Sequence, residues 1–196
     1  MKRITVVICL MICLTNAFGQ NHKRVHPVTN QDTEYADDFI YTFQFFGMKQ
    51  KLYKDTISDE EYRFLGMPRE NNEFIIDIKK KADSYSISWS KSNAAWDSDS
   101  KKAKADPLKS KDISESQWLE FVKRVQDMRF WHMVQANGDE EHDTNSQDAW
   151  LFEGKDNKRY HIICWWEPMP HSKKLYGCLK YLLELTGMKA KLVKPY

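Results

Sequence analysis

The stretch that decides the fold is Trp150-Leu151-Phe152-Glu153-Gly154, followed by Tyr160-His161-Ile162-Ile163-Cys164-Trp165-Trp166. Aromatic and β-branched residues dominate both runs, and a short polar segment around Asn157 separates them. This pattern predicts a β-hairpin with strands over Ala149–Glu153 and Tyr160–Trp166. Both faces of the second strand are apolar, so we expect it either to lie centrally in a sheet or to offer an aromatic patch on one side.

Two amphipathic helices are predicted on either side of this hairpin. The first begins with the capping-box pattern Ser114-Glu115-Ser116-Gln117 and is expected to end near Phe130-Trp131. Its apolar face consists of Trp118, Phe121, Val122 and Val125. The second helix is expected to end at Gly187, after apolar positions that recur at helical spacing. These positions are Leu175, Cys178, Leu179, Leu182 and Thr186.

Further strands are predicted nearer the N-terminus. Phe39–Met48 is rich in β-favouring aromatics, and Phe74–Ile78 follows a turn signal. Tyr85–Ser90 alternates apolar residues with serines, which is typical of a half-exposed strand, here expected at a sheet edge. Lys91–Lys111 is rich in Ser, Lys and Asp, so we expect a long surface loop there.

The order of strands, helix, hairpin and helix defines the expected fold class. It predicts an α+β fold with a mainly antiparallel sheet and two helices packed on one face. We expect a single domain over residues 34–190. Residues 20–33 are polar and lack periodicity, so we expect a mobile N-terminal arm.

The N-terminus resembles a secretory signal peptide over residues 1–19. Lys2 and Arg3 precede an apolar run from Ile4 to Leu14, and small residues suited to cleavage end at Gly19. The run is shorter than the roughly 20 residues that a membrane-spanning helix needs. We therefore expect an exported protein, periplasmic or extracellular, with no membrane span after signal removal.

Charge and cysteine content narrow the function classes. The chain has 30 basic and 28 acidic residues, and removing Lys2 and Arg3 with the leader leaves the two kinds equal in number. A neutral chain has no basic field for a nucleic-acid backbone, so no nucleic-acid partner is expected. Cys164 and Cys178 remain after processing, either bridged, since the exported compartment permits disulfides, or reduced and packed as small hydrophobic residues.

Motifs for metals and cofactors are incomplete. Residues 139–145 begin like a calcium loop, but Thr144 replaces the required glycine and Trp150 the closing glutamate. The segment is read as a solvated acidic loop, with a weak metal site left open. Zinc ligands would have to converge from separate elements. The candidates are His132, His142, His161, His171 and Cys164. No metal or cofactor is expected.

No catalytic residue is assigned from the sequence. No Gly-x-Ser-x-Gly elbow occurs. Cys164 and His161 are three residues apart on one predicted strand and so point to opposite faces. The alternative enzymatic hypothesis is a hydrolase whose site assembles from Glu153, His161 and Glu167.

The leading hypothesis is a non-enzymatic binding or interaction protein of the bacterial envelope. Exposed aromatics anchor protein partners and contact sugars, and Trp165 is the best candidate for exposure. The candidate binding residues are Trp165, His161, Glu153 and Glu167, and the expected partner is a protein or a polysaccharide of the envelope. An immunity or inhibitor protein is a further alternative.

Four short motifs resemble a family of uncharacterised bacterial exported proteins. They are Tyr62-Arg63-Phe64-Leu65, Phe130-Trp131, Trp150–Gly154, and Tyr160-His161 with Trp166-Glu167-Pro168. The family has Asp-Gly before its Trp-x-x-Glu strand and Asp-Arg before its Trp-x-Pro, where this chain has Ser146-Gln147 and Cys164-Trp165. The resemblance implies a shared fold and export, and it implies no activity.

Overall fold

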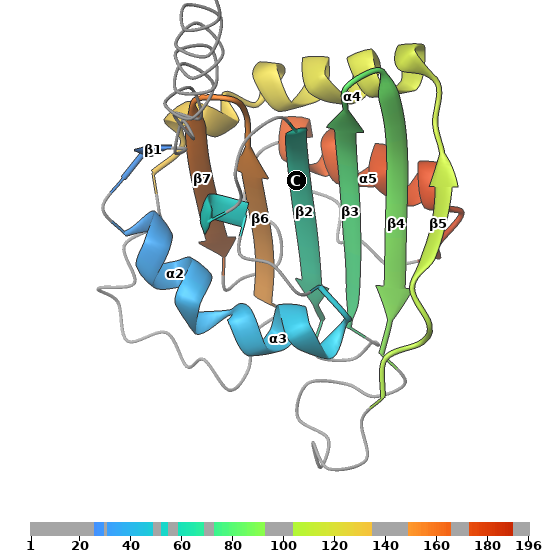
Figure 1. The fold of residues 1–196 in the computed structure, drawn as a ribbon, viewed down its shortest axis with the longest axis horizontal. Coiled ribbons are helices and arrows are strands. Elements are labelled where there is room, and N and C mark those ends of the chain that lie inside the picture. Colours follow the sequence, from blue (N-terminus) through green and yellow to red (C-terminus); the bar gives the residue numbers. More distant parts are fainter. Residues whose placement is uncertain are drawn as a thin grey trace, which may run out of the picture.

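The computed structural model describes residues 26–29, 31–48, 52–54, 59–68, 73–92, 104–134, 149–165 and 173–189. Within these residues the chain has an α+β fold built on a mainly antiparallel sheet, as the sequence predicts. Seven strands in the described residues form the sheet in the order β1-β7-β6-β2-β3-β4-β5, and β1 alone pairs in parallel (Figure 1). The strands are β1 His26–Pro27, β2 Asp59–Met67, β3 Phe74–Lys81, β4 Ser84–Lys91, β5 Lys109–Asp112, β6 Ala149–Lys155 and β7 Arg159–Trp165.

Helices lie against both faces of this sheet. They are α2 Asp32–Asp38, α3 Ile40–Phe45, α4 Glu115–Asp127 and α5 Lys173–Thr186, with the short 3-10 helices η1 Leu52–Lys54 and η2 Phe130–His132. Figure 1 shows α2 and α3 in front of the sheet and α5 behind it.

Strand alternation divides the core into two layers. Phe64 lies opposite Ile76 and Phe152 in the sheet, and these three share a buried cluster with residues of α4 and α5, which we call the α4–α5 face. The next residue, Leu65, shares the other cluster with residues of α2, α3 and η1, which we call the α2–α3 face. Burying one such side chain fully is worth about 1.5–3 kcal/mol. Apolar residues on both faces of the central strands therefore account for a sheet covered on both sides.

The hairpin, the start of α4 and the end of α5 match their sequence signals, whereas α4 ends at Asp127, before the expected Phe130-Trp131. β6 pairs with β7 from Trp150 opposite Trp165 to Lys155 opposite Tyr160. Ser114 caps α4 as predicted, because its hydroxyl accepts a bond from the Gln117 backbone N–H while the Gln117 side chain accepts from the Ser114 N–H. α5 ends at Thr186, and Gly187 follows with a φ of +70°, a conformation that suits glycine.

The predicted strand over Phe39–Met48 is wrong, because this segment contains α3. Phe39, Phe43 and Phe46 are all buried, and their spacing of four and three residues follows one side of a helix. The aromatic composition favours a strand, but here the helical spacing of the buried rings decides the local structure.

The predicted loop over Lys91–Lys111 and the edge position of β4 also need correction. β5 begins at Lys109 and pairs with β4, so β4 is an inner strand and β5 forms the edge. All four residues of β5 are exposed. An exposed, lysine-containing edge strand carries no apolar alternation that the sequence could reveal, and such charges are a common protection against edge-to-edge pairing.

The N-terminal segment meets the sheet before residue 33, the expected end of the mobile arm. Pro27 pairs with Tyr160 of β7, and Asp32 is completely buried at the start of α2. Residues 1–19, the predicted signal peptide, lie outside the described residues. Within the described part of the chain, no helix is both long and apolar enough to span a membrane.

Candidate functional site

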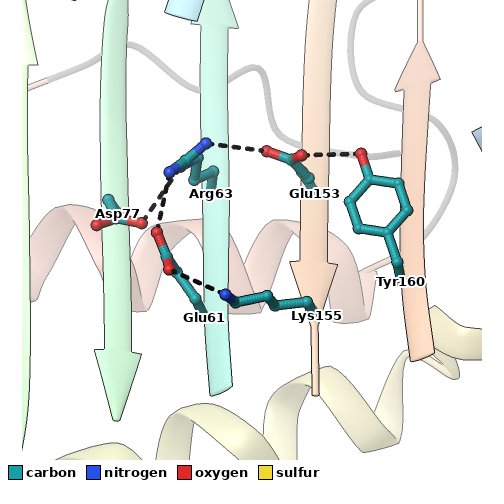
Figure 2. Close-up of polar contacts among 6 residues, drawn as sticks. All are labelled: Glu61, Arg63, Asp77, Glu153, Lys155 and Tyr160. Carbon is teal, nitrogen blue, oxygen red and sulfur yellow. Dashed lines mark hydrogen bonds and ion pairs between the residues drawn. The ribbon is translucent and has the colours of Figure 1, made fainter. Parts of the chain in front are cut away.

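A cluster of charged side chains lies within the sheet, on the α2–α3 face (Figure 2). Strand register brings it together, because Arg63 of β2 lies between Asp77 of β3 and Glu153 of β6. Glu61 lies opposite Lys155 by the same register. We call these residues, with Tyr160 of β7, the buried polar cluster. Its members are Glu61, Arg63, Asp77, Glu153, Lys155 and Tyr160.

Arg63 is the centre of the buried polar cluster. Its Nη2 donates to Glu61 Oε1 at 3.0 Å, its Nε lies 3.6 Å from Asp77 Oδ1, and its Nη1 lies 3.7 Å from Glu153 Oε2. The Phe43 ring of α3 lies on the same face, with its centroid 5.8 Å from the Arg63 guanidinium carbon. One guanidinium thus links three strands beneath a helix.

The remaining contacts extend the cluster to β7. Tyr160 Oη donates to Glu153 Oε1 at 2.8 Å, and Lys155 Nζ lies 3.9 Å from Glu61 Oε2. The exposed fraction of every charged side chain in the cluster is 9% or less. Ion pairs buried to this degree cost desolvation energy, and removing one partner typically costs about 3–5 kcal/mol.

The cluster holds three carboxylates against two cations, so the balance of charge favours protonating one carboxyl group. Burial raises the pKa of Glu153 to about 7, although Arg63 and the hydrogen bond from Tyr160 act in the opposite direction. Burial, followed by the charge of Glu61, raises the pKa of Asp77 well above its ordinary value. The cluster therefore retains a proton to higher pH than exposed carboxylates do.

A carboxyl group with a pKa near 7 is suited in principle to general acid–base chemistry. Glu153 is however completely buried, and its oxygens already face Tyr160 and Arg63. A substrate could reach it only if the packing changed. In the arrangement observed, the cluster is a set of buried contacts among four strands.

The structure does not bring Glu153 and His161 together. Glu153 lies opposite Ile162, so the neighbouring His161 points to the other face. His161 Nδ1 lies 2.8 Å from Asp32 Oδ1, and its Nε2 lies 3.1 Å from the Met133 carbonyl oxygen. Both Glu153 and His161 have an exposed fraction of 0%, so neither is a surface residue.

Asp32 attaches the N-terminal segment to the edge of β7. Its Oδ1 accepts a bond from the Ile162 backbone N–H at 3.1 Å in addition to its contact with His161, and its Oδ2 accepts from the Thr29 N–H at 2.6 Å. His161 is therefore a packed, hydrogen-bonded histidine at a structural junction. The sequence offers no signal for this pair, because Asp32 and His161 are 129 residues apart.

The structure describes only the backbone of one of the two other candidate binding residues, Trp165 and Glu167. The backbone of Trp165 pairs with Trp150 at the end of β7, and its side chain lies outside what the structure describes. Glu167 lies outside the described residues altogether.

A second feature is an open surface cleft, which we call the Trp131 cleft. It has a volume of about 710 Å³. It lies where α4 ends, η2 turns and β7 begins. Its lining residues are Gln126, Arg129, Phe130, Trp131, His132 and Arg159.

Arg159 is held firmly at this cleft. Its Nε and Nη2 donate to Asp156 Oδ2 at 3.0 and 2.6 Å, and its guanidinium carbon lies 4.3 Å from the centroid of the Trp131 ring. Asp156 also accepts bonds from the backbone N–H groups of Lys158 and Arg159, which fixes the hairpin turn. A two-point contact and a cation–π contact together pre-organise the guanidinium.

The ring packing beneath Trp131 requires a glycine at position 154. Gly154 lies opposite Tyr62 in the sheet, and a Cβ atom at this position would be 2.6 Å from Tyr62 Cδ1 and 2.7 Å from Phe130 Cε1. The absence of that atom lets the Tyr62 and Phe130 rings pack beneath Trp131, at centroid distances of 6.1 and 5.0 Å.

Arg129 has an unusual backbone between α4 and η2. Its φ of 57° and ψ of 39° lie in the left-handed region, which costs a residue other than glycine about 1–2 kcal/mol. Its side chain is exposed at the mouth of the cleft. The sequence motif Phe130-Trp131 predicted only a helix end here. No periodicity in the sequence indicated that Arg159 would contact Trp131.

The structure describes both cysteines and some of the candidate metal ligands. Cys164 and Cys178 are both free and buried, and they belong to the α2–α3 and α4–α5 faces respectively. Burial raises the pKa of Cys178 to about 12, which does not suit a nucleophile. Among the described residues no group of three or more His, Cys, Asp or Glu side chains is arranged to hold a metal ion. His142, His171 and residues 139–145 lie outside the described residues.

Comparisons with models of protein families, with curated proteins and with solved structures gave no match. The function is therefore inferred from the residues of the chain itself.

Proposed function

We propose that this chain is an exported, non-enzymatic binding protein of the bacterial envelope, and that it engages a protein or polysaccharide through the Trp131 cleft. The signal-peptide pattern of residues 1–19 supports export. The resemblance to exported bacterial proteins also supports export.

The observation that carries this proposal is the contact of Arg159 with Trp131 at an open cleft. Arginine and tryptophan are the residue types most often found to dominate binding energy at interfaces. Arg159 is fixed by Asp156 before any partner arrives, so little conformational entropy is lost on binding. The cleft also lies on regular elements, the end of α4 and the start of β7, which hold its residues in place.

The buried polar cluster has a supporting role in this proposal. Its carboxylates and cations contact one another inside the sheet and are shielded from solvent. Its contacts link β2, β3, β6 and β7 of the sheet on which the cleft is built. Trp165 lies at the far end of β7 from Arg159, so the proposed surface rests on Trp131 and Arg159 instead of Trp165.

An immunity or inhibitor role is one form of this binding function, in which the partner is a toxin or an enzyme. No feature of the cleft favours a toxin or an enzyme over other partners.

Site-specific photo-cross-linking in the cell tests the proposal. A benzophenone-bearing phenylalanine analogue replaces His132, which is exposed and lines the cleft. The control carries the same analogue in place of Lys174, which is exposed on α5 outside the cleft. We expect a discrete adduct from position 132 that is absent from position 174. No adduct at position 132, or the same adducts from both positions, would contradict the proposal.

A further inference from the structure

Two of the residues that line the Trp131 cleft, Arg129 and Arg159, are cationic. Arg129 and His132 are exposed, and the side chain of Arg159 retains an exposed fraction of 45%. Within the described part of the chain, the Arg129 guanidinium forms no ion pair. Asp156 offsets the charge of Arg159. Arg129 therefore supplies the uncompensated positive charge of the cleft.

The donors that remain suit a carboxylate. Arg159 uses Nε and Nη2 for Asp156, and no hydrogen bond of its Nη1 is seen among the described residues. A guanidinium presents its N–H groups in a planar fork that matches the two oxygens of a carboxylate. With two guanidinium groups at one cleft, an anionic ligand is favoured over a neutral one.

The surroundings of Trp131 favour a peptide over a sugar. A sugar ring needs an open aromatic face, but the Trp131 ring already contacts Arg159, Phe130 and Tyr62. Val134, two residues beyond His132, has an exposed fraction of 77%, which makes it one of the most exposed large apolar side chains described. An exposed apolar residue two positions along the chain from His132, a residue of the cleft, complements a segment in which acidic and apolar side chains alternate.

We infer that the Trp131 cleft binds an acidic peptide segment of a partner protein, with Arg129 and Arg159 contacting its carboxylates and Val134 contacting an apolar side chain. This inference rests on the proposed binding function and names its ligand class.

Fluorescence anisotropy with a labelled peptide tests the inference. The probe is a short peptide in which Glu alternates with Leu, and it is compared with its Gln counterpart and with an oligogalacturonide as competitor. The variant is Arg129→Asn, because asparagine tolerates the left-handed backbone of this position better than most residues. The matched control is Lys123→Asn, at an exposed position of α4 outside the cleft. Circular dichroism and a melting curve establish that both variants fold.

We expect the Glu peptide to bind at least about tenfold more tightly than the Gln peptide, in keeping with the loss of a charge-assisted hydrogen bond. Arg129→Asn should weaken Glu-peptide binding by about tenfold, and Lys123→Asn by less than about twofold. Raising the salt concentration should also weaken it.

Equal affinities for the Glu and Gln peptides would overturn the inference, as would an unchanged affinity in Arg129→Asn. Stronger competition by the oligogalacturonide than by unlabelled Glu peptide would also overturn it, in favour of a polysaccharide. If the cross-link at position 132 persists in any of these cases, the binding function stands and only the ligand class is wrong. If the cross-link is also absent, both fail.

Discussion

Replacing Glu153 with glutamine should remove a pH dependence of stability that the buried polar cluster creates. Glutamine has nearly the same shape as glutamate, and its carbonyl oxygen can accept the bond that Tyr160 Oη donates at 2.8 Å. The substitution therefore removes the ionisation while it leaves most of the packing intact.

The magnitude follows from the shift in pKa. Burial raises the pKa of Glu153 from 4.5 to about 7. One pKa unit corresponds to about 1.4 kcal/mol, so the shift is worth about 3 kcal/mol. Because the folded state favours the protonated carboxyl group, this stability is fully present below the unfolded pKa and is lost as the pH rises through the folded pKa. The window is thus from about pH 4.5 to about pH 7.

Urea unfolding of the wild type and of Glu153→Gln, measured from about pH 4 to about pH 8, checks this prediction. At the acidic end both proteins carry a neutral side chain at position 153, so their free energies of unfolding should be close. At the alkaline end the variant should be more stable relative to the wild type by about 3 kcal/mol. The control is Glu120→Gln on the exposed surface of α4, where the difference from wild type should stay nearly constant.

A difference between wild type and Glu153→Gln that is the same at about pH 5 and about pH 8 would refute this reasoning. It would mean that Glu153 ionises in the folded state as it does in the unfolded chain.

Three further substitutions test contacts within and around the sheet. Arg63→Ala leaves the buried carboxylates without their central cation and should lower the free energy of unfolding by about 3–5 kcal/mol in a denaturant titration. Asp32→Asn should cost about 1–3 kcal/mol, because an amide nitrogen cannot accept a bond, and should speed hydrogen exchange of the Ile162 amide; unchanged exchange would argue against that contact. Gly154→Ala places a Cβ atom 2.6 Å from Tyr62 and should lower the melting temperature, with a loss of more than about 2 kcal/mol; a neutral effect would contradict the close packing.

Much of the secondary structure was predictable from local sequence. The capping box at Ser114, the hairpin around Asn157 and the helix end at Gly187 each depend on residues close together in the chain, so their signals could be read directly. The segment Phe39–Met48 was misread because aromatic residues favour strands on average. The spacing of Phe39, Phe43 and Phe46 carried the correct helical signal.

The candidate sites were less predictable, because strand register creates them. Glu153 was identified as a candidate binding residue, but its partners Arg63 and Tyr160 lie on two other strands. A charged residue in a predicted hairpin strand is ordinarily assigned to the surface, whereas in the structure Glu153 is completely buried on a strand paired on both sides. The contact of Arg159 with Trp131 likewise joins the start of β7 to η2, which lies 28 residues earlier, so no local sequence pattern predicts it.

The central claim, that the Trp131 cleft is the binding surface, is tested most directly by nuclear magnetic resonance mapping. Adding the Glu-Leu peptide to ¹⁵N-labelled protein should shift the amide signals of residues 126–132 and 159 and the indole signal of Trp131, assigned with Trp131→Phe. Shifts concentrated at the far end of β7 around Trp165, or no shifts at saturating peptide, would contradict the claim.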